Sequence, residues 1–193
     1  MRIKTTLALR ILLLSLGLSP AHAQDRAKKD IATIYAEGKV TGNEYVNLYF
    51  GVTLSSEGGA FTQGDFVSPA GTRARLIDLE RNAARWDDRF EIAILADSRA
   101  ANPLIRNPQQ YVRAMRHQFE RQGMITVRAE SAVELSGVPF VRAILKMNES
   151  AAAHYRAIYS TFLKGYIVSL DVSAATPEKL DRVVASAVRF KTN

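Results

Sequence analysis

Two stretches rich in β-branched and aromatic residues, HYRAIYSTFL at 154–163 and YIVSLDVS at 166–173, are separated by Lys164-Gly165 alone. A two-residue connection that ends in glycine is typical of a β-hairpin, because glycine readily adopts the positive φ that such turns require. Strands joined by so short a turn run antiparallel, so this segment predicts an antiparallel sheet. The register pairs apolar residues across the hairpin, Tyr159 with Leu170 and Ala157 with Val172.

A second hairpin is predicted just before the first. Residues 126–135 and 140–147 both read as strands, and they flank Ser136-Gly137-Val138-Pro139. Glycine and proline interrupt a strand ladder and favour a turn, so these four residues are expected to connect the two strands.

Residues 73–97 allow two interpretations. Leucine and alanine recur at helical spacing in the first half, whereas RFEIAILADS in the second half is strand-like. Residues 75–88 could therefore form a helix, or the segment could be two strands joined around residues 82–88. The clear strand pattern of the second half favours the hairpin.

The segment GNEYVNLYFGVTLSS, residues 42–56, alternates apolar and polar side chains and predicts one strand. Its buried face would carry Val46, Leu48, Phe50, Val52 and Leu54. Its second face would carry Tyr45, Asn47, Tyr49, Thr53 and Ser55. That second row could bind a ligand, or could form a polar packing layer with Tyr155, Tyr159 and Tyr166. We predict the packing layer, because tyrosine rings pack well while their hydroxyl groups reach a partner or water.

Two amphipathic helices are predicted from their start and stop signals. Asn107 and Pro108 open the first helix, and Gly123 ends it after residue 122. Thr176 and Pro177 open the second in the same manner, and its apolar face continues to Phe190.

The predicted order is strand, hairpin, helix, two hairpins, helix. Strands linked by tight turns and accompanied by few helices indicate an α+β fold, in which amphipathic helices cover the faces of an antiparallel β-sheet. A doubly wound parallel sheet would require helices that alternate with the strands, and this order lacks that alternation.

The start of the chain has the pattern of a cleaved export signal. Arg2 and Lys4 precede the apolar run LALRILLLSLGL, which is too short to span a membrane, and Ala21-His22-Ala23 follows. We expect cleavage between Ala23 and Gln24, and a periplasmic or secreted protein. Residues 1–23 would then be the signal peptide, 24–41 a flexible lead-in, and 42–193 a single α+β domain.

Composition excludes several classes of function. The chain has no cysteine, so a mature domain must fold without disulfides, and thiol catalysis and thiolate metal sites are impossible. Removal of the three basic residues in the signal lowers the net charge from +7 to +4. That mild excess lacks the clustered basic stripe of nucleic-acid-binding proteins, although it is compatible with an anionic surface.

Three short motifs resemble the PsbP-like α/β/α sandwich superfamily. They are Y-x-N-x-Y-F-G at 45–51, E-L-S-G-V-P-F at 134–140, and K-G-Y-I-V-S-L at 164–170 followed by a final helix ending in Phe190. The resemblance covers roughly residues 45–190. It implies an α/β/α sandwich and a non-catalytic accessory or assembly factor that holds another protein.

Candidate catalytic and metal-binding residues are few. His117 and Glu120 could face one metal ion, but a usable site needs three or four ligands and no third is apparent, so no metal or cofactor is predicted. Ser98 beside Asp97 is the best placed serine. A group of carboxylates lies near the only tryptophan, Trp86, and consists of Asp87, Asp88 and Glu91.

Two candidate contact surfaces remain. The polar side of the first helix carries Arg113, Arg116, His117 and Arg121, whose guanidinium groups suit an anionic partner. The Gly- and Ser-rich stretch SSEGGAFTQGDFVSPAG at 55–71 predicts a long loop that carries Phe61 and Phe66. Aromatic side chains on such a loop could anchor a partner, or could fold back over the sheet.

These observations favour an exported, non-enzymatic binding or accessory protein of the bacterial cell envelope, which engages another protein. One alternative is a small secreted hydrolase that uses the carboxylates or Ser98. Another is peripheral attachment to an anionic lipid surface, without a membrane span after signal cleavage.

Overall fold

The computed structural model describes residues 31–64, 71–147 and 154–191, so the predicted signal peptide and Phe66 lie outside the described residues. Eleven strands are described: β1 Gly38–Thr41, β2 Glu44–Asn47, β3 Val52–Ser55, β4 Ala60–Thr62, β5 Arg73–Arg81, β6 Phe90–Ser98, β7 Met124–Leu135, β8 Val138–Met147, β9 Tyr155–Leu163, β10 Tyr166–Ala174 and β11 Val188–Phe190. The helices are α2 Pro108–Arg121, α3 Pro177–Ala187 and the 3₁₀ turn η1 Trp86–Asp88. A short helix also covers residues 31–36.

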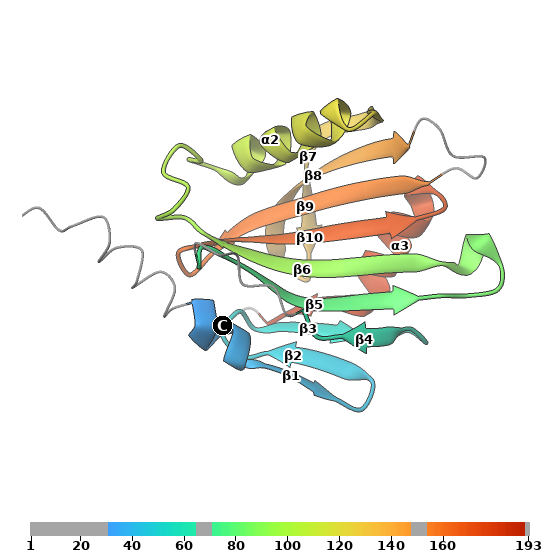
Figure 1. The fold of residues 1–193 in the computed structure, drawn as a ribbon, viewed down its shortest axis with the longest axis horizontal. Helices are drawn as coiled ribbons and strands as arrows, with labels where there is room; N and C mark the ends of the chain where they lie inside the picture. Colours follow the sequence, from blue (N-terminus) through green and yellow to red (C-terminus); the bar gives the residue numbers. More distant parts are fainter. Residues whose placement is uncertain (1–30, 65–70, 148–153, 192–193) are drawn as a thin grey trace, which may run out of the picture.

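The strands form two antiparallel sheets (Figure 1). The larger has seven strands in the order β4-β5-β6-β10-β9-β8-β7, and the smaller has four in the order β1-β2-β3-β11. The α+β prediction is confirmed, with two sheets in place of the one expected. Helix α2 packs against β7, β8 and β9 on one face of the large sheet, whereas α3 packs against β9 and β10 on the other.

The main core lies between the large sheet and the layer formed by α3 and the small sheet. Fully buried side chains from both sheets and from α3 meet there, including Leu54, Leu79, Ile94, Leu170 and Leu180. A smaller cluster under α2 contains Val112, Phe119, Ala143, Leu145 and Ile158. Burial of these apolar side chains is what holds the two layers on the sheet.

The predicted hairpins form. β9 and β10 pair around Lys164-Gly165, with Tyr159 opposite Leu170 and Ala157 opposite Val172. β5 and β6 also pair, so residues 73–97 are a hairpin and the helical interpretation of residues 75–88 is wrong. The turn between β7 and β8 is shorter than predicted, because Pro139 already lies in β8 opposite Glu134.

Both helix starts are as predicted. Asn107 accepts a hydrogen bond from the Gln110 backbone N–H over 2.9 Å, and Thr176 accepts one from the Lys179 N–H over 3.2 Å. The end of the second helix is a correction, since α3 ends at Ala187 and residues up to Phe190 form β11. As a strand, Val188 and Phe190 pair with β3 and bury their side chains.

The single strand predicted for residues 42–56 is wrong. The segment is a hairpin, β2 and β3, with a turn over residues 48–51. The turn reverses the two faces of the first half, so Tyr45 and Asn47 are fully buried while Leu48 is 68% exposed. Asn47 explains the turn, because its side-chain oxygen accepts the Phe50 N–H over 3.1 Å and its amide donates to the Ile34 carbonyl over 3.0 Å.

Two segments predicted to be irregular contain regular structure. The described part of the predicted lead-in includes the helix at residues 31–36, whose Ile31 and Ile34 are buried, and strand β1. The predicted loop at residues 55–71 contains β4, which pairs with β5 and carries Phe61 against the core. Tyr45, Tyr159 and Tyr166 are likewise buried in the main core rather than in a separate layer.

Candidate functional site

The face of the large sheet that carries α2 is only partly covered by that helix (Figure 1). One row of directly paired residues crosses the sheet from β8 to β5. It begins with Ala143 and Ile158, which lie under α2, and continues through Asp171, Ala93 and Asp78. The row is apolar beneath the helix, and beyond it two aspartates flank the small, buried Ala93. Among the described residues, no helix crosses β10, β6 and β5 on this side, and we call this region the open face.

The open face is lined by oppositely charged pairs. Arg75 binds Asp78 through Nε over 2.6 Å and reaches Glu91 over 3.4 Å. Arg156 binds Asp171 through Nε over 2.6 Å. Each arginine of the open face is thus already paired with a carboxylate of the same chain. The face can form charge-assisted hydrogen bonds with a ligand without presenting an unpaired charge.

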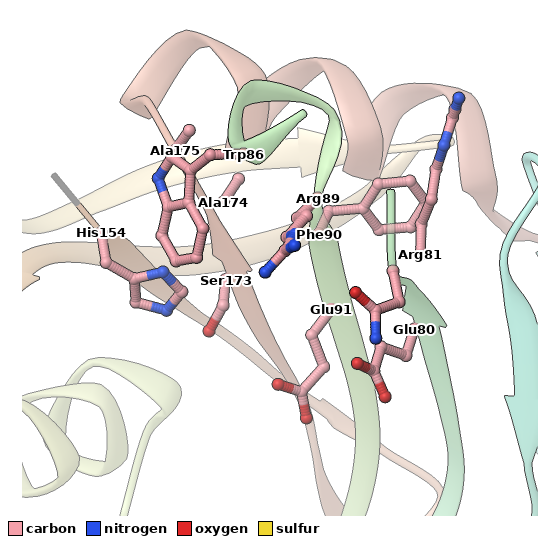
Figure 2. A pocket seen from close by; sticks show the side chains of 11 residues that line it. Glu80, Arg81, Trp86, Arg89, Phe90, Glu91, His154, Ser173, Ala174 and Ala175 are labelled. Atoms are coloured by element: carbon pink, nitrogen blue, oxygen red, sulfur yellow. The ribbon is translucent and has the colours of Figure 1, made fainter. Parts of the chain in front are cut away.

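A hollow of about 220 Å³ lies at one end of the open face (Figure 2). Its walls come from the ends of β5, β6 and β10, from His154 just before β9, and from the turn that contains η1. Its lining includes Glu80, Trp86, Arg89, Glu91, His154 and Ser173. Strand alternation puts Glu91 in the hollow and turns Phe90 towards the core on the opposite side of the sheet.

Trp86 forms the aromatic wall of the hollow and remains 37% exposed. The His154 ring lies beside the indole, with 5.7 Å between the two ring centroids. Arg89 Cζ lies 5.6 Å from the centroid of the Trp86 ring. Arg89 also donates through Nε to the Ala83 carbonyl over 2.8 Å, which holds the guanidinium group near the indole. Arg89 and Trp86 therefore form a cation–π contact within the β5–β6 turn.

Glu80 and Glu91 lie directly opposite each other on β5 and β6. Like charges in that position repel, and such pairs destabilise a sheet. Burial and the neighbouring Asp171 carboxylate raise the pKa of Glu91, against the opposing effect of Arg75. The two glutamates form an acidic side of the hollow. A basic group of a ligand would relieve the repulsion between them.

Burial, and secondarily the positive charge of Arg156, lowers the pKa of His154. The imidazole is therefore neutral at neutral pH and offers one hydrogen-bond donor and one acceptor beside the indole. Trp86, His154, Arg89, the two carboxylates and the Ser173 hydroxyl all line the hollow and can together recognise a polar ligand.

Sequence reasoning noticed Trp86 and Glu91 but missed the hollow. His154 and Ser173 are distant from Trp86 along the chain, and only the pairing of β6, β10 and β9 brings them together. The available signal was the single tryptophan of the chain, placed in a polar turn between two strands.

The predicted arginine surface of α2 contacts acidic side chains of its own chain. Arg116 binds Glu120 over 2.6 Å and Glu130 of β7 over 2.8 Å, and His117 contacts Glu120 over 2.8 Å. Arg113 lies 3.9 Å from Glu130. These contacts neutralise much of the positive surface, while Arg121 stays exposed at the end of the helix.

The carboxylates at this surface respond to their neighbours. Hydrogen bonds from Thr126 and His117, with a further one from Arg116, lower the pKa of Glu120 to about 2. Burial opposes ionisation of Glu130, but the hydrogen bond and charge of Arg116 outweigh it and the pKa of Glu130 is lowered. Glu130 was not recognised from the sequence, because it lies on a strand and not on the helix.

The residues named for a hydrolase do not converge. Glu91 and Ser98 lie seven residues apart on β6, which separates them by roughly 23 Å at the strand rise of about 3.3 Å per residue. Asp97 is held by Arg73 and Tyr111. Asp87 and Asp88 line a different hollow, beside Lys179 of α3.

His117 Nδ1 and Glu120 Oε2 contact each other directly over 2.8 Å. Within the described ranges, however, no three residues among histidine, aspartate and glutamate are grouped closely enough to hold a metal ion. The same part of the chain contains no helix of the length and apolar character that crossing a bilayer requires.

Comparisons with known proteins find only distant structural similarity. No protein-family model matches the chain, and no curated protein matches it. A solved structure from Bacteroides thetaiotaomicron VPI-5482 aligns with a TM-score of 0.43 and 8% identity, over 80% of this chain and 50% of that one. The chain therefore spans half the length of that protein.

Two further solved structures are similar at the same level. LpqN, described as involved in cell envelope biogenesis of Mycobacterium tuberculosis, has a TM-score of 0.43 and 12% identity over 73% of this chain and 91% of that one. The immunity protein TplEi of the type VI secretion system from Pseudomonas aeruginosa, solved with a peptide, has a TM-score of 0.37 and 9% identity over 90% and 84%. The resemblance to the PsbP-like superfamily is not confirmed by these comparisons.

Proposed function

We propose that this chain is an exported, non-enzymatic binding protein of the bacterial cell envelope, and that it holds a segment of another protein at the Trp86 hollow. The observation that carries the proposal is the partly exposed Trp86 ring, with Arg89 and His154 placed against it. Tryptophan and arginine are the residue types most enriched among interface residues that dominate binding energy.

The charges beside the hollow suggest the character of the bound segment. Glu80 and Glu91 face each other at its acidic side, and Glu91 is already shifted towards its protonated form. A lysine or arginine side chain of the partner would place its positive charge between them. An aromatic or aliphatic neighbour in the same segment would contact the indole of Trp86.

Export to the envelope rests on the sequence of residues 1–23, with its basic start, apolar run and Ala21-His22-Ala23. The intact mass of the protein purified from cells tests this directly. A chain that begins at Gln24 supports export, whereas a retained N-terminal segment counts against cleavage at the predicted site.

The binding proposal is tested with the full chain, expressed with a C-terminal tag and purified gently from the envelope fraction for native mass spectrometry. A partner protein should co-purify with the native chain. The affinity for that partner should fall roughly 30-fold in Trp86→Ala, which corresponds to the loss of about 2 kcal/mol typical of a dominant interface residue. Arg89→Ala should weaken it as well.

Matched controls separate this site from general damage. Ile125→Ala removes an exposed apolar side chain from β7, and Arg85→Ala removes an exposed arginine next to η1, so both should bind normally. A partner that binds Trp86→Ala as tightly as the native chain contradicts the proposal.

The two surfaces predicted from the sequence are the competing locations for the same function. Loss of the partner in an Arg113→Ala and Arg121→Ala double variant, with Trp86→Ala unaffected, would move the site to the arginine surface of α2. Loss on joint replacement of Phe61 and Phe66 would move it to the segment around β4.

A further inference from the structure

One end of the molecule, opposite the Trp86 hollow, combines exposed leucine with positive charge. Three connections meet there: the β2–β3 turn, the segment between β6 and α2, and the β9–β10 turn (Figure 1). We call this region the basic end and define it by Leu48, Arg99, Leu104, Arg106, Lys164 and Lys191.

Hydrogen bonds hold these connections together. Lys164 donates through Nζ to the Tyr49 carbonyl over 2.5 Å, and the Arg99 N–H donates to the Gly165 carbonyl over 3.2 Å. The Lys191 N–H donates to the Gly51 carbonyl over 2.9 Å. The loops therefore form one continuous surface instead of three independent ones.

The charges at the basic end have one sign. Residues 48–51, 99–107 and 164–166 contain lysine and arginine but no aspartate or glutamate. Glu37 contacts this end through its backbone, because its carbonyl accepts the Leu48 N–H. Asp97, two residues before Arg99, is buried and paired with Arg73. This end differs from the arginine surface of α2, where Arg116 is ion-paired with glutamates of the same chain.

The apolar part of the basic end is unusually exposed. Leu104 is 85% exposed and Leu48 is 68% exposed, more than any other large apolar side chain in the described part of the chain. Leu48 lies in the β2–β3 turn and Leu104 in the segment between β6 and α2. Either side chain can therefore enter a membrane surface without disturbing the sheet. A hollow of about 340 Å³ at this end is lined by Tyr49, Ser98 and Lys164 among others.

We infer that the basic end docks on an anionic phospholipid membrane surface. Clustered lysine and arginine are attracted to anionic headgroups, and exposed leucines gain from burial at the boundary between headgroups and acyl chains. Leu48 adjoins Tyr49, whose carbonyl holds Lys164, and Leu104 lies two residues before Arg106, so both contributions act at the same end of the molecule. This attachment is independent of the proposed function, because the Trp86 hollow lies at the other end of β6 and stays accessible.

The test uses co-sedimentation of the folded chain with vesicles. Vesicles of phosphatidylglycerol and phosphatidylethanolamine should bind it, and binding should weaken steeply as salt is added. Vesicles of phosphatidylcholine alone should bind it far less. An absence of binding to the anionic vesicles, or equal binding to both kinds, overturns the inference.

Two pairs of substitutions locate the surface. Arg106→Gln with Lys191→Gln should lower the partition coefficient on anionic vesicles roughly 25-fold, since each basic residue near such a surface contributes about fivefold. Leu48→Ser with Leu104→Ser should lower it roughly 10-fold through lost burial. All four side chains are exposed, so the variants should have the same urea midpoint of unfolding as the native chain.

Each pair has a control elsewhere on the molecule. Arg85→Gln with Arg182→Gln removes two exposed charges away from the basic end, and Ile125→Ser with Val127→Ser removes two exposed apolar side chains from β7. Both controls should bind anionic vesicles within about twofold of the native chain after allowance for the lower net charge. Equal losses in the controls and the test variants would show general charge attraction and refute a defined docking end.

Discussion

Tyr111 of α2 donates its hydroxyl hydrogen to the Asp97 carboxylate at the end of β6 over 2.8 Å. Arg73 of β5 binds the other side of the same carboxylate through Nε over 2.6 Å. Asp97 is 4% exposed, so a buried charge is held by one cation and one hydroxyl group. This contact ties α2 to the strand end from which the basic end begins.

Replacement Tyr111→Phe should destabilise the fold by about 1–3 kcal/mol, because a buried carboxylate loses a hydrogen bond that no solvent can replace. Urea denaturation measures the change. Tyr155→Phe is the matched control, since the Tyr155 hydroxyl makes no hydrogen bond with the described residues and its loss should change stability by less than about 0.5 kcal/mol. Equal effects of the two substitutions would contradict this role for Asp97.

Asn47 should be far less tolerant of substitution than other asparagines. In Asn47→Ala the Ile34 carbonyl and the Phe50 N–H both lose a buried partner, and we expect a loss of about 2–4 kcal/mol. Asn43→Ala, in the exposed turn before β2, is the control and should be nearly neutral. A small effect at Asn47 would mean that the β2–β3 turn forms without its side chain.

The Arg116–Glu130 ion pair should make stability depend on pH. The folded-state pKa of Glu130 lies below its ordinary value of 4.5, so its stabilising contribution is present above pH 4.5 and is lost as the pH falls through the folded-state pKa. Arg116→Met should therefore destabilise the chain at neutral pH, by about 2 kcal/mol, and the difference should shrink under acidic conditions. Denaturation curves across that range measure it.

Arg121→Met provides the comparison for the same helix. Its side chain is exposed at the last turn, so its removal should leave both the stability and its pH dependence close to those of the native chain. A constant destabilisation by Arg116→Met at every pH would indicate lost packing instead of a lost ion pair.

The fluorescence of Trp86 should report protonation of His154. The pKa of His154 lies below its ordinary value of 6.5, so the imidazole stays neutral until the solution is more acidic than pH 6.5. The cation then quenches the adjacent indole, and folded-state stability also decreases as the pH falls through that pKa. The transition should disappear in His154→Gln and persist in His117→Gln. A midpoint above pH 6.5 would be inconsistent with a buried imidazole.

Much of the fold could be read from local sequence. The Lys164-Gly165 turn determined both the partners and the register of β9 and β10, because a two-residue connection leaves no freedom in pairing. Asn107 and Thr176 marked the two helix starts for the same kind of reason, since a cap acts within three residues of its own position. Neither feature depends on distant parts of the chain.

Alternation alone was misleading at residues 42–56. A pattern with period two cannot distinguish one strand from two strands joined by a turn. Here the buried side-chain amide of Asn47 stabilises the turn by accepting the Phe50 N–H. Asn47 donates to the Ile34 carbonyl, so its side chain links the turn to the helix at residues 31–36, which the local alternation pattern does not reveal. The same holds for β11, which replaces the end of a helix because β3 offers it a hydrogen-bonding edge.

Local sequence was enough to predict the antiparallel hairpins and the two helix starts, because each depends on residues close together in the chain. Which of the charged and aromatic residues act together depends on how the elements pack in three dimensions. Glu130 reaches Arg116 from β7, and His154 reaches Trp86 across the sheet. The first contact needs α2 to pack on β7, and the second needs β6, β10 and β9 to lie side by side. Burial of the whole core sets that packing, so it cannot be read from any single segment.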